Sequence, residues 1–180
     1  YKHIIACSEK AREKYLEAYP NIEHISTINN GVDIKQYQKA LPYTKHELLG
    51  ISDECIVVTM VARFMFMKRQ DTIVEAISKL SKKYHVCLVG GESTDEGLIK
   101  VQRLAEDLGV SDRVHFLYVR PDVPRILKTS DVVVMSSEYE GLSLSSIEGM
   151  AAGKPFIATN VNGLKEVVAE GKKRNIAIGS

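Results

Sequence analysis

The stretch Asp131-Val132-Val133-Val134-Met135, followed by the fifteen residues Ser136 to Met150, decides the fold. The first five residues form a β-branched apolar run, which predicts a buried strand of a parallel sheet. Downstream, Leu144, Ile147 and Ala151 recur at helical spacing and predict a helix with one face on that sheet. The turn between them then lies at the carboxyl end of a strand and the amino end of a helix. Open α/β sheets bind their ligands at this edge.

This turn combines an anion-binding helix start with two acidic side chains. The backbone N–H groups of Leu142 and Ser143 are expected to point at an anion, which the helix dipole also favours. Glu140 lies in the turn, and Glu148 lies two helical turns further along. Both carboxylates would repel a phosphate that they faced, so we expect them to accept hydrogen bonds from hydroxyl groups beside it. A ligand with phosphate and vicinal hydroxyls, a sugar nucleotide, fits this pattern.

A basic loop follows the most apolar strand of the chain, Cys55 to Val61. Arg63 and Lys68 lie in this loop, which leaves the same edge of the predicted sheet. Two cations there would neutralise a diphosphate, the arginine through its planar fork and the lysine as a point charge. The alternative is a solvated basic loop without a ligand. The residues Phe64 to Met67 are unusually apolar for a loop, and we expect them either to pack in the core or to contact another domain or a membrane surface.

Strands alternate with helices along the rest of the sequence. Strands are predicted at 3–7, 22–28, 55–61, 84–89, 114–119, 131–135 and 156–159, and helices at 9–19, 44–49, 71–80, 94–108, 123–128, from 144 and from 164. Ser8 and Asp122 are the expected N-caps of two helices, and Thr72 to Glu75 forms an expected capping box. This alternation predicts an α/β fold, a Rossmann-like doubly wound parallel sheet with helices on both faces. No element is predicted in the stretch 171–180.

The composition is that of an ordinary globular protein. Lys and Arg number 24 and Asp and Glu 23, so the net charge of +1 gives no reason to expect nucleic-acid binding. The three cysteines and five histidines lack metal-binding spacing, and no G-x-G-x-x-G or P-loop motif occurs, so we expect neither a metal nor a cofactor. The cysteine pattern favours reduced thiols, and no apolar run reaches the roughly 18–20 residues of a membrane span. We therefore expect a cytoplasmic location.

Five motifs resemble those of the retaining, nucleotide-sugar-dependent glycosyltransferases with the GT-B fold, family four in particular. In chain order they are the Ser-Glu helix start at 8–9, N-G-V-D at 30–33, R-x4-K at 63–68, E-G-x6-E at 140–148 and A-x-G-K-P at 151–155. The sequence differs from the usual family wording by Ser136 for Pro, Leu142 for Phe, Ser143 for Gly and Gly149 for Ala. Order and spacing make the resemblance specific over roughly residues 3–170.

The resemblance implies roles for individual residues in donor binding. Arg63 and Lys68 would hold the donor's diphosphate and stabilise it as it leaves. Glu148 would bind the ribose hydroxyls, and Glu140 the hydroxyls of the donor sugar, which makes Arg63, Lys68 and Glu140 the candidate catalytic residues. The main chain would complete the site at Gly90, Val119, Gly141, Leu142 and Ser143, with the segment at Val119 reading the nucleobase.

The resemblance also implies a domain division and a reaction. Residues 1–30 would be the tail of a missing N-terminal acceptor domain or the crossover into the next domain, and residues 31–180 a C-terminal donor-binding domain that is cut short at its C-terminal end. The reaction would be retaining transfer of a sugar from a nucleoside-diphosphate sugar to an acceptor hydroxyl, in glycan or glycolipid biosynthesis.

The acceptor would bind through the missing domain, so this fragment alone is expected to be inactive. The resemblance is also compatible with peripheral association of the full-length protein with the inner face of the membrane. Two other functions stay open: a GT-B-like sugar-nucleotide epimerase and a non-catalytic α/β interaction domain.

Overall fold

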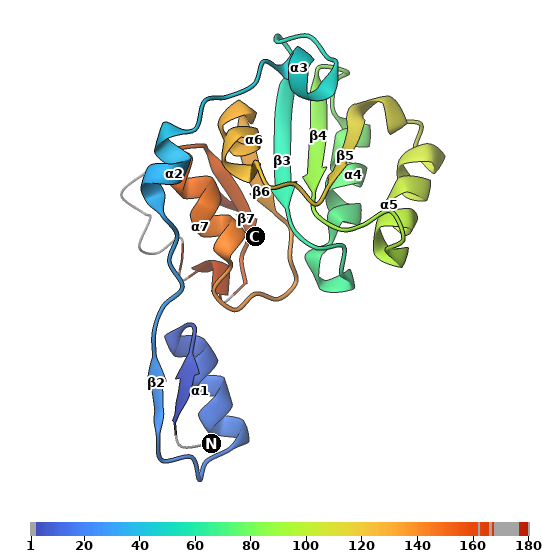
Figure 1. Cartoon of the computed structure of the whole chain (residues 1–180). Helices are drawn as coiled ribbons and strands as arrows, with labels where there is room; N and C mark the ends of the chain where they lie inside the picture. Colours follow the sequence, from blue (N-terminus) through green and yellow to red (C-terminus); the bar gives the residue numbers. More distant parts are fainter. Residues whose placement is uncertain (1–2, 162, 166, 168–176, 180) are drawn as a thin grey trace.

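The computed structural model describes residues 3–161, 163–165, 167 and 177–179. It shows a parallel sheet with helices packed on it, and a small β-α-β unit precedes this sheet in the chain (Figure 1). The predicted alternation of strands and helices is present, which confirms the α/β class.

Six strands form the main sheet in the order β5-β4-β3-β6-β7-β8, and every neighbouring pair is parallel. They are β3 (Ile56–Val61), β4 (Tyr84–Val89), β5 (Val114–Tyr118), β6 (Val132–Met135), β7 (Phe156–Thr159) and β8 (Ala177–Gly179). The chain winds outward from β3 to β5, returns to place β6 beside β3, and then winds outward in the other direction. This is the strand order of a Rossmann-like doubly wound sheet, and the reversal between β3 and β6 is where such sheets bind ligands.

Helices lie on both faces of this sheet. They are α2 (Ile34–Lys39), α3 (Lys45–Leu49), α4 (Gln70–Lys79), α5 (Glu96–Asp107), α6 (Val123–Thr129) and α7 (Leu144–Ala151), with 3-10 turns at Phe66–Lys68 and Ser111–Arg113. Side chains of β3 and β4 alternate between two apolar clusters: Met60 and Leu88 belong to one, and Val57 and Cys87 belong to the other together with Ile126 of α6. A strand that buries both faces is expected in a parallel sheet, and it explains the continuous apolar runs of the sequence.

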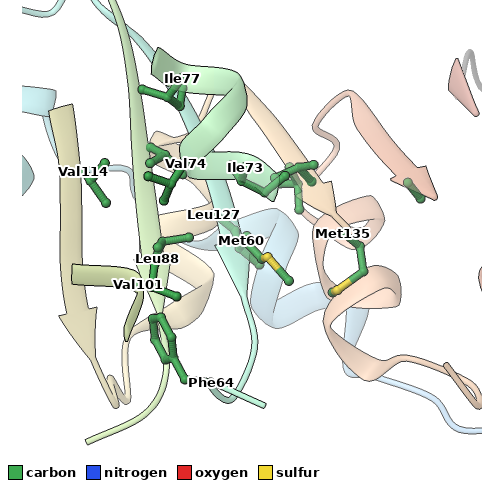
Figure 2. Close-up of a cluster of buried hydrophobic side chains, with 14 of the residues drawn as sticks. Met60, Phe64, Ile73, Val74, Ile77, Leu88, Val101, Val114, Leu127 and Met135 are labelled. Atoms are coloured by element: carbon green, nitrogen blue, oxygen red, sulfur yellow. The ribbon is translucent and has the colours of Figure 1, made fainter. Parts of the chain in front are cut away.

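The larger apolar cluster includes residues of α4, α5 and the strands beside them (Figure 2). Phe64, from the loop after β3, joins this cluster and lies against Phe116 with the ring centroids 6.1 Å apart. The three residues that follow are exposed, Phe66 by 86%. The expectation of core packing for the apolar loop is therefore confirmed for Phe64 alone.

The N-terminal unit consists of β1 (Ile4–Ala6), α1 (Glu9–Ala18) and β2 (Ile25–Thr27), and its two strands form a separate parallel pair. The predicted cap is confirmed, because the Ser8 side chain accepts a hydrogen bond from the Ala11 N–H. This unit and the segment after it contact the rest of the chain near the start of α7. Lys14 Nζ of α1 lies 4.5 Å from the ring centroid of Tyr139, and Asn30 Nδ2, three residues after β2, donates to the Leu142 carbonyl oxygen at 3.1 Å.

Two predicted caps are wrong. Helix α4 begins at Gln70, two residues before the expected capping box at Thr72, because Arg69 adopts φ 54° and ends the preceding 3-10 turn there. Asp122 stands at the N-cap position of α6, but its carboxylate binds the Arg120 guanidinium instead of a backbone N–H of the helix. An ion pair with a neighbouring arginine competes here with the weaker capping bond.

Helix α2, strand β8 and the 3-10 turns at Phe66–Lys68 and Ser111–Arg113 were not predicted. Helix α2 follows directly after the N-G-V-D motif, with Asp33 as its N-cap, and β8 falls in the stretch 171–180. In the part of the chain that the structure describes, no helix is long and apolar enough to span a bilayer.

A histidine pair lies at the amino-terminal side of the sheet. His85 Nδ1 and His115 Nε2 are 3.0 Å apart, and the rings stack with their centroids 5.3 Å apart. Burial lowers the pKa of both imidazoles, and the neighbouring His85 lowers the pKa of His115 further, to about 4. In the unfolded chain both histidines have their ordinary pKa of about 6.5, so they bind protons more readily there than in the folded chain. Folding stability is therefore lost as the pH falls from about 6.5 toward 4.

We expect the free energy of unfolding to fall by about 1–2 kcal/mol between pH 7 and pH 4.5 through this pair, a value that is discounted for solvent screening of the partly exposed rings. Urea unfolding at the two pH values measures the loss. The variant His115→Gln should show a smaller loss than the parent protein, whereas an identical loss in both proteins would exclude the pair as its source.

Candidate active site

The loop after β3 is fixed in place at the point where the winding reverses. The Gln70 side chain is buried and donates from Nε2 to the Arg63 carbonyl oxygen at 2.9 Å. From the other side, Ser136, the first residue after β6, donates from Oγ to the carbonyl oxygens of Lys68 and Arg69 at 2.9 and 2.7 Å. The loops that follow β3 and β6 are therefore joined to each other by hydrogen bonds.

A buried ion pair joins the same two loops through their side chains. Lys68 Nζ lies 2.6 Å from Glu140 Oε1, and the two side chains are 18% and 7% exposed. Ser137 Oγ donates to the same carboxylate oxygen at 2.7 Å. Two of the predicted site residues, 72 positions apart in sequence, are thus in direct contact. A carboxylate that is buried this deeply requires such partners, because desolvation without them is costly.

The turn from Glu140 into α7 provides free hydrogen-bond donors. Ser143 is the N-cap of α7, and its Oγ accepts a weak bond from the Ser146 N–H at 3.4 Å. Within the described residues, the N–H groups of Gly141, Leu142 and Ser143 donate to no protein acceptor. The positive end of the helix dipole adds to these donors, so the turn is suited to bind an anion.

Arg63 and Glu148 belong to the elements next to this turn, the loop after β3 and helix α7. Arg63 follows β3 at the carboxyl edge of the sheet, and its exposed guanidinium has no ion-pair partner in the described part of the chain. Glu148 is half-buried on α7, five residues after the N-cap. Burial first, and then the negative charge of Glu148, raise the pKa of Tyr37 from α2. The described residues contain no group of three or more His, Cys, Asp or Glu side chains that could hold a metal ion.

Comparison with known protein families supports a specific class for this arrangement. The sequence profile described as "Glycosyl transferases group 1" matches residues 44–179, which is most of the chain. The chain belongs to this family. The resemblance of its motifs to those of the GT-B glycosyltransferases is thereby confirmed.

Relatives and solved structures agree with this membership of the group 1 glycosyltransferases. The chain is 31% identical over 169 residues to D-inositol 3-phosphate glycosyltransferase 2 of Catenulispora acidiphila, covering 86% of the chain and 39% of that protein. It is 32% identical over 155 residues to the Escherichia coli UDP-Gal:alpha-D-GlcNAc-diphosphoundecaprenol alpha-1,3-galactosyltransferase, covering 82% and 39%. The structure of Anabaena Alr3699/HepE in complex with UDP-glucose superimposes with a TM-score of 0.87 at 26% identity, covering 99% of this chain and 50% of that one. The chain thus spans about two fifths of the two curated relatives.

The remaining predicted residues of this glycosyltransferase domain lie at the same edge of the sheet. Gly90 follows β4 with φ 123°, and a Cβ there would lie 2.3 Å from the Ala62 carbonyl oxygen. The backbone at position 90 can lie this close to the end of β3 only because the residue is glycine. The sequence alone did not indicate this contact. Val119 follows β5 and is 68% exposed.

Two residues near the site were not predicted as site residues. The sequence from Asn162 to Glu166 resembles the family's G-G-x-x-E turn, but a helix start without a function was sufficient to explain it. Gly163 packs under the acidic turn, because a Cβ there would lie 1.6 Å from the Gly141 carbonyl oxygen and 2.3 Å from that of Glu140. Tyr37 of α2 is the second, and the negative charge of Glu148 contributes to its raised pKa. The glycine after Asn162 could have indicated a close approach, whereas nothing in the sequence around Tyr37 indicates that it is influenced by Glu148. Asn162 itself lies outside the described residues.

Proposed function

We propose that this chain is the donor-binding part of a retaining glycosyltransferase and binds a nucleoside-diphosphate sugar between the loops that follow β3 and β6. One observation carries the proposal: the Lys68–Glu140 ion pair joins these loops beside three free backbone N–H groups, at the reversal of a Rossmann-like sheet. Cations and N–H donors suit a diphosphate, whereas the two acids suit the hydroxyls of sugar rings.

The roles of the residues follow from where charge develops in the reaction. As the bond between the anomeric carbon and the diphosphate oxygen breaks, negative charge grows on the diphosphate. Arg63, Lys68 and the N–H groups of the turn from Gly141 to Ser143 would stabilise this charge and thus lower the barrier. The acceptor hydroxyl adds to the anomeric carbon and passes its proton to the departing diphosphate oxygen, with retention of configuration. The positive charges of Arg63 and Lys68 would stabilise the diphosphate in place of a metal ion, so we propose that no metal or other cofactor takes part.

Glu140 and Glu148 would orient the two sugar rings. Glu140 is held by Lys68 and Ser137 through one oxygen, which leaves its second oxygen for the hydroxyls of the donor sugar. Glu148 would accept hydrogen bonds from the ribose hydroxyls. The main chain near Val119 would contact the nucleobase. Because the solved structure of Alr3699/HepE contains UDP-glucose, UDP-sugars are the first donors to test.

We further propose that residues 1–30 belong to an acceptor domain and residues 31–180 to the donor domain. A glycan or glycolipid is the expected acceptor class, and the exposed Phe66 would allow peripheral association of the full-length protein with a membrane. The chain alone is expected to bind donor weakly without turnover.

Calorimetric titration of this chain with UDP, GDP and ADP tests the proposal. We expect one of the three nucleotides, UDP in the first instance, to bind with a dissociation constant at least about tenfold lower than the others, since a base-reading segment discriminates between bases. The absence of binding by all three nucleotides would contradict the proposal. Rapid sugar transfer by the chain alone would contradict the assignment of the acceptor domain.

A further inference from the structure

The turn before α7 directs its carbonyl groups toward other parts of the chain. A Cβ on Gly163 would lie 1.6 Å from the Gly141 carbonyl oxygen but 2.6 Å from the carbonyl carbon, so this oxygen points at Gly163. The Glu140 carbonyl oxygen would lie 2.3 Å from the same Cβ. The next carbonyl oxygen, that of Leu142, accepts a hydrogen bond from Asn30 Nδ2 at 3.1 Å. Three successive carbonyl groups of the turn therefore face protein atoms.

The same contacts set the direction of the free N–H groups of the turn. A peptide unit is planar and trans, so its N–H group points away from its C=O group. The N–H groups of Gly141, Leu142 and Ser143 belong to the three peptide units whose carbonyl groups face Gly163 and Asn30. These donors therefore point away from both partners. Within the described residues, Asn30 is the only hydrogen-bond donor to the Leu142 carbonyl oxygen.

Asn30 is itself held by the N-terminal unit. Its backbone N–H donates to the carbonyl oxygen of Cys7, the residue after β1, at 3.3 Å. The residue is partly buried and lies in the segment that runs from β2 to α2 (Figure 1). A carbonyl oxygen can only accept, so it requires the amide nitrogen of the side chain as its partner. The segment that leaves the N-terminal unit thus reaches the anion-binding turn through one amide group.

We propose that Asn30 is a positioning residue, whose side-chain amide holds the Leu142–Ser143 peptide so that the Ser143 N–H faces the diphosphate of the donor. This inference rests on the proposed function. Without the bond, the peptide unit would have to be oriented when the donor binds, which costs conformational entropy. The bond orients it before the donor arrives. The Ser143 N–H and the Leu142 C=O belong to one peptide unit, so a diphosphate on the N–H and Asn30 on the C=O would strengthen each other's hydrogen bonds.

The test compares UDP with uridine, which lacks the diphosphate, by NMR titration of the chain. The parent chain should bind UDP more tightly than uridine. In Asn30→Ala, the affinity for UDP should fall by about 3- to 10-fold, the usual effect of losing one neutral hydrogen bond, and the affinity for uridine should not change. A partial loss of folded protein would weaken both ligands equally, so the ratio of the two affinities reports on the diphosphate contact alone. Should the panel select GDP or ADP, the matching nucleoside replaces uridine.

Two further variants complete the design. Asn29→Ala removes the preceding asparagine, whose side chain is exposed, and should leave both affinities unchanged. Ser143→Pro removes the N–H group itself, and Ser143 has φ −72°, which proline also adopts. In the Ser143→Pro background, the additional change Asn30→Ala should cause little further loss of UDP affinity, because both changes act on the same donor. The other effects of the proline are common to both members of this comparison.

The outcomes separate this inference from the function on which it rests. A parent chain that binds UDP no more tightly than uridine would contradict diphosphate binding at this turn, and with it the proposed function. A parent chain that prefers UDP, together with an unchanged preference in Asn30→Ala, would overturn the positioning role of Asn30 alone. Additive losses in the double variant would also overturn it, because Asn30 would then act by a route other than the Ser143 N–H.

Discussion

Replacing Arg63 by alanine in the full-length protein is expected to lower kcat/KM for sugar transfer by about 10²–10³-fold, the usual cost of removing one group that stabilises developing negative charge. The guanidinium is exposed and unpaired in the described part of the chain, so its interactions would be made with the donor alone. Release of nucleoside diphosphate from the donor in the presence of acceptor measures the effect. The urea unfolding curve of the variant should match that of the parent protein.

Arg103→Ala is the matched control, since Arg103 is also exposed but lies on α5. We expect it to change neither the rate nor the stability. An Arg63→Ala variant that keeps the parent rate would remove Arg63 from the catalytic residues. Equal losses in both variants would point to a general effect of positive charge instead of a specific contact.

The second large effect is expected on stability. Lys68→Met should lower the free energy of unfolding by about 3 kcal/mol, because it leaves the Glu140 carboxylate buried without its counter-ion. The double variant Lys68→Met/Glu140→Gln removes both charges and should recover most of this loss. Urea unfolding at neutral pH measures both values. Both variants should lose affinity for the nucleotide, since neither retains the lysine.

Glu138→Gln provides the comparison with an exposed pair. Glu138 pairs with Arg69, and the two side chains are 48% and 32% exposed. Breaking such a pair should cost less than about 1 kcal/mol. If Lys68→Met costs no more than Glu138→Gln, the pair between the two loops does not act as a buried one. A failure of the double variant to recover stability would instead show that the Lys68 side chain matters through its packing.

The fold could be predicted from sequence wherever burial leaves a strong pattern. Strands such as β3 and β6 are buried on both faces, so they form continuous apolar runs, and α5 shows helical apolar spacing over three turns. Helix α2 has six residues with one buried side chain, which is too little for a periodic signal. β8 is three residues long, and its pairing with β7 is a tertiary contact that leaves no local signature.

The site was predictable in outline because parallel strands bring their carboxyl ends to one edge. This rule indicated that Lys68 and Glu140 share a site, but the ion pair between them depends on the path of two irregular loops. The same limit applies to Gly90 and Gly163, whose close contacts are with backbone atoms of distant segments. Arg69 adopts a left-handed conformation that is uncommon for arginine, so the early start of α4 could not be foreseen.

A crystal structure of this chain with UDP bound is the most direct test of the central claim, that the two loops beside β3 and β6 enclose a nucleoside diphosphate. We predict that the diphosphate contacts the Arg63 guanidinium, the Lys68 ammonium and the N–H groups at the start of α7, with the ribose hydroxyls on Glu148. UDP that is bound elsewhere on the sheet, or bound without contacts to these groups, would contradict the account.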